Sequence, residues 1–299
     1  MAELDLQPLI LAGEGWDDYA LLDSGNGLKF ERYGAYRFIR PEAQALWQPR
    51  LAEWDGDGEF VPASDEDGGG RWQFRRPVPR DGWPLARGDV RFTAQCTPFR
   101  HLGFFPDMAP VWDWMGGELA GGNLSTLNLF GYTGVGTLAL SQYGPVTHVD
   151  ASKKSVAQAR ENAALSNMAD RPIRWLVDDA AKFAAREVRR ERRYDGIILD
   201  PPKFGRGPEG EVWRLEDHLP ALIGDCRQLL DERSRFLFLT VYAVRMSALA
   251  LAGLLNEAFA EMPGSIEFGD LAVREEGVAG RLLPTAIFAR WRNPADPLN

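Results

Sequence analysis

The residues with the clearest chemical meaning lie in segment 195–204, which reads Asp-Gly-Ile-Ile-Leu-Asp-Pro-Pro-Lys-Phe. Its apolar run, 196–199, predicts a buried strand, and Asp200 follows directly. Pro201 and Pro202 then stop the strand, because proline has no N–H and restricts the residue before it. The turn presents a carboxylate, backbone carbonyls and an aromatic ring at the carboxyl end of a strand, where open α/β sheets bind ligands. A plain turn that ends a core strand is the alternative.

A glycine-rich segment lies upstream of this turn. The apolar stretch 124–130 predicts a strand, which runs into Gly131, Gly134 and Gly136. Glycines at a strand-to-helix turn let the backbone approach a ligand and direct helix N–H groups toward an anion. The dinucleotide pattern is G-x-G-x-x-G, whereas this chain has G-x-x-G-x-G. The spacing therefore disfavours NAD and FAD.

Carboxylates follow the next three predicted strands. Asp150 ends the second strand, where a carboxylate can accept hydrogen bonds from ribose hydroxyls. Asp178 and Asp179 end the third, where a carboxylate can accept from an adenine amino group, and Asp200 ends the fourth. Helix-capping acids can imitate one or two of these positions, but four polar turns in succession at one sheet edge predict a ligand that contains adenosine.

The elements that must position these residues form a regular alternation from about residue 108 onward. The predicted strands are 124–130, 146–150, 173–177, 194–200 and 235–240, with a closing pair at 266–271 and 285–291. The predicted helices are 135–143, 152–167, 180–192, 213–231 and 245–259. Such alternation indicates an α/β fold with a Rossmann-like, doubly wound, mostly parallel sheet, here of seven strands, in residues 106–299. Residues 1–105 contain short alternating segments between glycine, proline and acidic turns, which predict a smaller antiparallel β-rich domain.

Length, charge and cysteine content narrow the function classes. The 299 residues contain no apolar stretch near the roughly 18 needed to span a membrane, and the acidic N-terminus is unlike a signal peptide. Cys96 and Cys226 match no zinc spacing. We therefore expect a cytoplasmic protein with reduced thiols, no metal and no membrane partner, and the sequence leaves the oligomeric state open. The net charge of −9 does not suggest a nucleic-acid-binding protein. Phosphates are bound by local basic surface, however, so the distribution of charge along the chain is more informative than the total.

Basic and acidic residues are separated in the N-terminal part. Residues 71–100 hold seven arginines against two acids, interleaved with five aromatic residues. Arginines with aromatic rings bind phosphates and stack on unpaired bases, which predicts a possible RNA or substrate recognition surface. Strand faces solubilised by arginine over a hydrophobic core explain the composition equally well. Residues 53–67 hold seven acids and no base, and stretch 55–70 predicts a mobile surface loop.

Residues from about 100 to 292 resemble class I methyltransferases that use S-adenosyl-L-methionine (SAM). More narrowly, they resemble the large-subunit ribosomal RNA methyltransferase family, whose members modify cytosine C5 or guanine. The matching segments are 103–107, 128–134, 149–152, Asn162, 178–179 and 200–204. The resemblance implies SAM as the cofactor and RNA as the partner.

The resemblance also assigns residues to the site. Those implied at the cofactor are Phe105, Asp107, Asn128, Phe130, Gly131, Tyr132, Thr133, Gly134, Asp150, Ala151, Ser152, Asn162, Asp178, Asp179, Ala180 and Asp200. Those implied in catalysis are Asp200, Pro201, Pro202 and Phe204. Lys203 is expected at the substrate, on a phosphate or on the cofactor carboxylate, with a solvated lysine as the alternative. Tyr242 is expected to line the pocket, with a place in the core as the alternative.

Two departures from the family pattern bear on the reaction. The larger members carry an N-terminal RNA-binding PUA domain, and we expect this chain to be too short to hold one. Members that methylate cytosine C5 use a cysteine nucleophile. Here turn 240–245 has no cysteine, and Lys203 occupies the other common cysteine position. We therefore expect methylation at nitrogen.

The expected function is SAM-dependent methylation of an RNA base, with ribosomal RNA as substrate. Asp200 and the Pro201 carbonyl would hold the hydrogens of an exocyclic amine, and Phe204 would stack on a flipped base. The alternative enzyme is a SAM-dependent methyltransferase of protein side-chain amides, which uses the same Asp/Asn-Pro-Pro turn, followed by one of small molecules. A scaffold that binds SAM or RNA without methyl transfer is the non-enzymatic alternative.

Overall fold

The structure is a computed structural model that describes residues 2–63, 69–242, 245–277 and 280–293. Contacts between Cα atoms divide the chain into two compact units. The larger unit comprises Met1–Leu11, Val111–Asp270 and Ala286–Asn299, and the smaller comprises Ala12–Pro110 and Leu271–Thr285.

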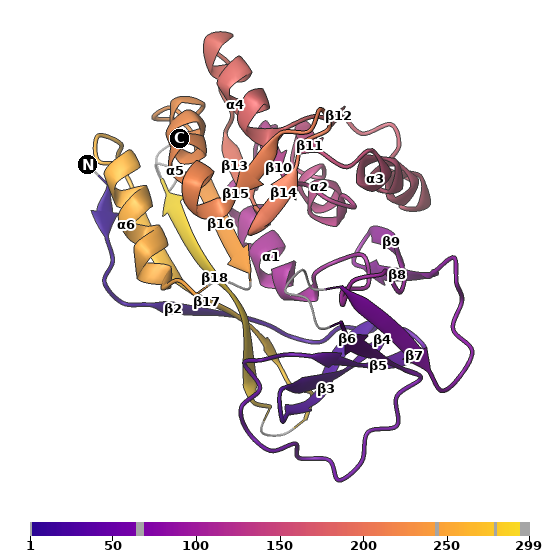
Figure 1. The fold of residues 1–299 in the computed structure, drawn as a ribbon. Coiled ribbons are helices and arrows are strands. Elements are labelled where there is room, and N and C mark those ends of the chain that lie inside the picture. Colours follow the sequence, from indigo (N-terminus) through magenta and orange to yellow (C-terminus); the bar gives the residue numbers. More distant parts are fainter. Residues whose placement is uncertain (1, 64–68, 243–244, 278–279, 294–299) are drawn as a thin grey trace. The chain divides into compact units, whose positions relative to one another are not determined.

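A mixed sheet of nine strands, counted over the described ranges, organises the larger unit (Figure 1). Its order is β1-β17-β18-β16-β13-β10-β11-β12, and β2 also pairs with β17. The strands are β1 (Glu3–Leu4), β2 (Leu9–Gly13), β10 (Thr126–Leu129), β11 (Val146–Asp150), β12 (Ile173–Val177), β13 (Gly196–Leu199), β16 (Phe236–Tyr242), β17 (Ser265–Arg274) and β18 (Leu282–Arg292). From β16 to β12 neighbouring strands are parallel, whereas β18 is antiparallel to β16. The predicted doubly wound sheet is confirmed, and the strand order reverses between β10 and β13.

The sheet has more strands than the seven predicted. The additional strands β1 and β2 come from the N-terminal segment, and β1 pairs in parallel with β17 through Glu3 opposite Ser265. The reason is the edge that β17 presents: a strand of ten residues has a row of backbone groups that needs partners. Short N-terminal strands satisfy part of that edge.

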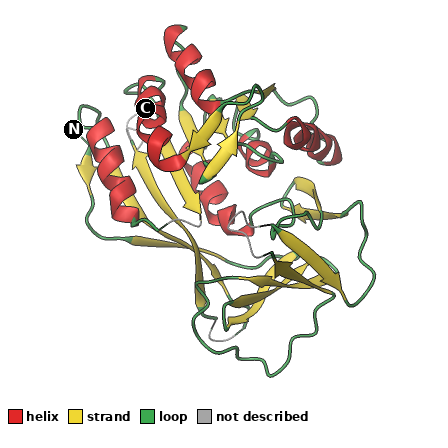
Figure 2. Ribbon diagram, viewed as in Figure 1, coloured by secondary structure: helices red, strands yellow, loops and turns green. Residues whose placement is uncertain are grey.

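Helices cover both faces of this sheet (Figure 2). They are α1 (Ala109–Leu119), α2 (Val135–Leu140), α3 (Lys153–Leu165), α4 (Ala180–Arg189), α5 (Leu215–Gln228) and α6 (Ala248–Ala258). Side chains alternate along β16: Leu237 and Leu239 belong to the core cluster that α4, α5 and α6 complete. Phe236 and Phe238 point the other way, with ring centroids 5.3 and 5.4 Å from Trp114 of α1. Burial on both faces explains why β13 and β16 are almost wholly apolar.

One predicted helix was wrong at its start. Residues 213–231 were expected to be helical, but α5 begins at Leu215. The preceding residues form β15 (Val212–Arg214), which pairs antiparallel with β14 (Phe204–Arg206). The intervening sequence, Gly-Pro-Glu-Gly-Glu, favours a turn, which allows the two short strands to form a hairpin.

The smaller unit is built from sheets whose strands are mainly antiparallel, as the alternating N-terminal segments predict. Among the described strands, β5 and β6 form a parallel pair. Its five-stranded sheet has the order β3-β4-β5-β6-β7, and β8 pairs with β9. The strands are β3 (Tyr19–Gly25), β4 (Leu28–Tyr33), β5 (Tyr36–Pro41), β6 (Gly58–Pro62), β7 (Gly70–Phe74), β8 (Trp83–Arg87) and β9 (Val90–Ala94). The expected loop over 55–70 was wrong where β6 forms, because Phe60 is buried opposite Trp72 of β7. Residues 64–68 of that expected loop lie outside the described residues.

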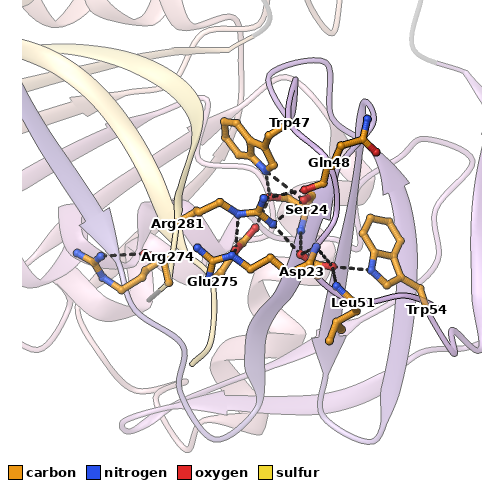
Figure 3. A network of polar contacts seen from close by, with 11 residues as sticks. Asp23, Ser24, Trp47, Gln48, Leu51, Trp54, Arg274, Glu275 and Arg281 are labelled. Atoms are coloured by element: carbon orange, nitrogen blue, oxygen red, sulfur yellow. Dashed lines mark hydrogen bonds and ion pairs between the residues drawn. The ribbon is translucent and has the colours of Figure 1, made fainter. Parts of the chain in front are cut away.

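A buried polar network ties together distant segments of the smaller unit (Figure 3). Arg281 donates from Nη2 to Asp23 Oδ1 over 2.8 Å and from Nε to Glu275 Oε2 over 2.8 Å. Ser24 Oγ donates to the other Glu275 oxygen, and Trp54 Nε1 donates to the other Asp23 oxygen. Asp23 and Glu275 are only 1% and 2% exposed, so their charges depend on these donors.

Candidate active site at the switch point of the sheet

The glycine-rich loop joins β10 to α2 at the point where the strand order reverses. Gly134 has a φ of +79°, a conformation that favours glycine. A Cβ at Gly131 would lie 2.4 Å from Nδ1 of His148, and one at Gly134 would lie 2.7 Å from Cβ of Ala159. Both glycines therefore let the loop pack closely onto β11 and α3. This differs from the expected reason, which was close approach of the backbone to a ligand.

A chain of buried side chains lies beneath this loop. Asn128 Nδ2 donates to Thr137 Oγ1 over 2.8 Å, and Thr137 Oγ1 lies 2.8 Å from His148 Nδ1. Burial lowers the pKa of His148 to about 3, so its ring is neutral at physiological pH. Sequence reasoning missed His148, which lies between Thr147 and Val149 in β11. The Asn128 side chain is directed into this chain of bonds, and its role at the cofactor stays a prediction.

Asn162 of α3 holds the loop from the other side. Its side chain is fully buried, and Nδ2 donates to the carbonyl oxygen of Thr133 over 2.9 Å. A donor in this place satisfies a loop carbonyl that burial removes from water. Asn162 is thus placed to position the loop backbone.

Asp150 at the end of β11 contacts the same loop. Its Oδ2 accepts from the backbone N–H of Tyr132 over 2.9 Å, and Oδ1 accepts from that of Ser152 over 2.8 Å. Burial raises the pKa of the Asp150 carboxyl above its ordinary value, although these N–H groups counteract the shift. A carboxylate oxygen can accept two hydrogen bonds, so each oxygen retains capacity for a ribose hydroxyl.

The two acids after β12 have different partners. Asp178 forms an ion pair with Arg186 of α4 through Oδ2. Asp179 is the N-cap of α4, where Oδ1 accepts from the N–H of Lys182 over 2.9 Å. Ala180 is the first residue of that helix and is buried. Both acids lie half-buried at the carboxyl edge of the sheet next to β11.

The Asp-Pro-Pro turn follows β13, the other neighbour of β10. Asp200 is half-buried there, and the indole Nε1 of Trp213 donates to the carbonyl oxygen of Pro202 over 2.7 Å. The ring centroid of Trp213 also lies 5.2 Å from that of Phe130, in the glycine-rich loop. Sequence reasoning missed Trp213, because it placed the residue in a helix. The structure therefore brings the expected cofactor loop and the expected catalytic turn to neighbouring strand ends.

Comparison with solved structures decides the family. A SAM-dependent methyltransferase from Agrobacterium tumefaciens is 43% identical, with a TM-score of 0.90 over 97% of this chain and 95% of that one. The chain belongs to the SAM-dependent methyltransferase family. SMU.776, a putative methyltransferase complexed with SAH, shares the fold at 16% identity, with a TM-score of 0.69 over 92% of this chain and 75% of that one. No family model matches the chain.

Curated relatives of this methyltransferase match it over shorter stretches. Ribosomal RNA large subunit methyltransferase K/L of Desulfotalea psychrophila is 30% identical over 149 residues, which are 48% of this chain and 20% of that protein. The putative ribosomal RNA large subunit methyltransferase YwbD of Bacillus subtilis is 26% identical over 155 residues, 51% of this chain and 37% of that protein. The methyltransferase thus spans a fifth to about a third of the length of these relatives.

The cofactor of the methyltransferase is SAM. The chemistry of the residues after β11 and β12 fits this cofactor. Asp150 offers two acceptor oxygens, and the acids after β12 offer acceptors of the kind that an adenine amine needs. The described residues contain no group of His, Cys, Asp and Glu that could hold a metal ion. None of the described helices is long and apolar enough to cross a membrane.

The roles of the other predicted residues of the methyltransferase stay untested. Phe105 and Asp107 belong to the smaller unit, where Asp107 Oδ2 accepts from Thr285 Oγ1 over 2.7 Å; their contact with the cofactor stays a prediction. Tyr242 is half-buried at the end of β16. Residues 243 and 244 of the turn expected to lack a cysteine lie outside the described residues.

The arginine-rich segment 71–100 falls within the smaller unit. Phe92 is buried, whereas Phe74 and Phe99 are 50% and 49% exposed. Arg75 pairs with Glu59, and Arg76 pairs with Asp55 and Asp57, so part of the basic charge is matched by the neighbouring acidic stretch. A role of this segment in RNA recognition stays a prediction.

Proposed function

We propose that this methyltransferase transfers the methyl group of SAM to a nitrogen of a base in ribosomal RNA. The observation that carries the proposal is the Asp200–Pro201–Pro202 turn, which stands beside the glycine-rich loop at the switch point and continues into an exposed Phe204. The relatives named as ribosomal RNA large subunit methyltransferases support the choice of RNA. The β-rich smaller unit is proposed to contribute to RNA recognition.

The cofactor would be held by the polar turns after three strands. Asp150 would accept hydrogen bonds from the ribose hydroxyls, and Asp178 or Asp179 from the adenine amine. The loop 130–134 would face the remainder of the cofactor, with Asn162 fixing the loop from behind. Ala151, Ser152 and Ala180 would line the adenosine through their backbone.

The catalytic turn would orient the accepting nitrogen. When bound, SAM would supply a sulfonium methyl group to the lone pair of the base nitrogen, with the C–S electron pair left on sulfur and one proton of the methylated amine released to the Asp200 carboxylate or to water. The Asp200 carboxylate and the Pro201 carbonyl would accept hydrogen bonds from the amine and stabilise the positive charge that develops on it. Trp213 holds the next carbonyl, that of Pro202, and so keeps the turn in one conformation. Phe204 would stack on the flipped base.

Nitrogen is favoured over cytosine C5 because a C5 mechanism needs a cysteine thiolate. Cys226 is fully buried in α5, and burial raises the pKa of its thiol. Cys96 belongs to the smaller unit, and burial raises the pKa of its thiol to about 12. Lys203 follows Pro202 and is exposed, in place to contact a phosphate.

The test uses purified protein, radiolabelled SAM, and separate ribosomal RNA and protein fractions from cells that lack the gene. Label in RNA is expected, and nucleoside digestion will identify the base and the atom. Label in protein alone would replace RNA by a side-chain amide. Tight SAM binding with no transfer to any fraction would indicate a non-enzymatic scaffold.

A further inference from the structure

The hairpin of β14 and β15 has one face that is exposed along its whole length. The register places Phe204 opposite Arg214 and Arg206 opposite Val212. All four side chains are exposed, with Phe204 at 53% and Val212 at 45%. Trp213, between them in sequence, points to the opposite face and is buried. We call the four residues Phe204, Arg206, Val212 and Arg214 the outer face of the hairpin.

The hairpin is anchored at both of its ends. At its base, Trp213 Nε1 donates to the Pro202 carbonyl, and the N–H of Leu215 donates to the carbonyl oxygen of Lys203 over 3.0 Å. Near its tip, Lys182 of α4 pairs with Glu211 over 2.5 Å and with Glu209 over 3.4 Å. The outer face is therefore presented on a supported element, which lowers the entropic cost of binding a partner there.

The outer face carries positive charge that the rest of the hairpin does not neutralise. Within the described ranges, neither Arg206 nor Arg214 forms an ion pair, and no acid stands on this face. The two tip acids are instead engaged by Lys182. In a chain of net charge −9, two unpaired arginines beside an exposed phenylalanine and valine mark a local surface for an anionic, partly apolar partner.

We propose that the outer face binds the single-stranded RNA that flanks the target base. Arg206 and Arg214 contact phosphates, Val212 packs on an unpaired flanking base, and Phe204 stacks on the target base itself, as proposed above. Single-stranded RNA fits this face better than a duplex, because the faces of paired bases are not accessible to Phe204. Lys203, the residue between the catalytic turn and β14, continues the binding surface for the RNA strand toward the catalytic turn. This inference rests on the proposed RNA substrate and adds residues that determine how the substrate is held.

The test compares two double variants by fluorescence anisotropy. The probe is a fluorescein-labelled single-stranded RNA of random sequence and about 12 nucleotides, a length within the site sizes of single-strand binders. Arg206→Ala/Arg214→Ala should weaken binding about tenfold or more and reduce the slope of log affinity against log salt by about 1.4, since each single-strand phosphate contact contributes about 0.7. The charge-matched control is Arg160→Ala/Arg192→Ala, which removes two exposed arginines from α3 and from the segment after α4. The control should bind within about twofold of the wild-type protein.

A second variant tests stacking separately from charge. Phe204→Leu should weaken binding at least about fivefold with an unchanged salt slope. Affinity for SAM should stay at the wild-type value in every variant, which verifies folding of the larger unit. If the wild-type protein binds RNA and the outer-face variants bind as well as the control, the hairpin inference is overturned while the RNA function stands. If the wild-type protein binds no RNA, or binds an acidic peptide in preference, both proposals are overturned.

Discussion

The indole Nε1 of Trp213 donates a hydrogen bond to the carbonyl oxygen of Pro202 over 2.7 Å. The indole ring also contacts Phe130, with 5.2 Å between ring centroids. One buried side chain thus touches the turn after β13 and the loop after β10. The expected catalytic groups lie on the first of these segments and the expected cofactor-binding groups on the second. Trp213 therefore helps to set the distance between the methyl acceptor and the methyl donor.

Replacing this donor is expected to impair catalysis more than cofactor binding. Trp213→Phe retains an aromatic ring but loses the hydrogen bond, which is worth about 0.5–1.5 kcal/mol, so kcat should fall roughly 2- to 10-fold. The affinity for SAM, measured by calorimetry, should stay within about twofold of wild type. The matched control is Trp291→Phe, which removes an indole donor to the Pro263 carbonyl at 2.9 Å. The control should lose similar stability with an unchanged kcat; equal loss of kcat in both variants would contradict a positioning role.

Asp200 is expected to act on the substrate. Asp200→Asn should abolish detectable methyl transfer while SAM affinity changes by no more than a few-fold, because the lost negative charge faces the developing cation. The control is Asp195→Asn, at the other end of the same strand. Asp195 accepts from the N–H of Ser125 over 2.7 Å, so its role is structural and methyl transfer should persist in this variant. A loss of SAM affinity equal to the loss of transfer would place Asp200 on the cofactor instead.

Asp150 is expected to act on the cofactor. Asp150→Asn keeps the shape of the side chain but removes a charged acceptor, and hydrogen bonds to charged groups are worth about 1.5–3 kcal/mol. The dissociation constant for SAM should therefore rise roughly 10- to 150-fold, as measured by calorimetry. An unchanged dissociation constant would refute the ribose role of this carboxylate.

The free energy of unfolding is expected to depend on pH through His148. Burial lowers the pKa of His148 to about 3 in the folded protein, whereas the unfolded chain binds the proton near pH 6.5. The stability that a neutral His148 provides is fully present above about pH 6.5 and is lost as the pH falls toward 3, by up to about 1.4 kcal/mol per pH unit. Urea unfolding between about pH 7 and 5 should show a flatter dependence for His148→Asn than for the wild-type protein. Equal slopes would show that the ring is solvated.

The network of the smaller unit predicts a contrast between two neighbouring arginines. Arg281→Met leaves the buried Asp23 and Glu275 without this cation and should destabilise the unit by about 3–5 kcal/mol. Arg274→Met removes a pair with Glu14 whose side chains are 41% and 65% exposed, and should cost less than about 1 kcal/mol. Urea unfolding measures both effects. Equal effects would mean that the buried network adds no more stability than a surface pair.

The strands of the larger sheet could be predicted because each is specified by residues that are close together in the sequence. The apolar run that precedes Asp200 marked β13, since a strand buried on both faces needs a continuous hydrophobic segment. The same reasoning placed glycines, carboxylates and prolines at the carboxyl edge, because parallel strands end at the same side of a sheet. Segment 55–70 misled the prediction, because its Asp-Gly composition indicates a loop while Phe60 needs a partner that lies elsewhere in the chain.

By itself, the sequence determined the fold class, the succession of the main strands and helices along the chain, and the residue types at the strand ends. Only the tertiary structure decided the contacts between remote residues: Trp213 with Pro202, Gly131 against His148, and Arg281 with Asp23, which are 258 residues apart. It also decided that residues 204–214 form a hairpin with one exposed face. The physical reason is that a periodic pattern reports which side of an element is buried, whereas the partner of a buried donor, charge or ring depends on how the whole chain packs.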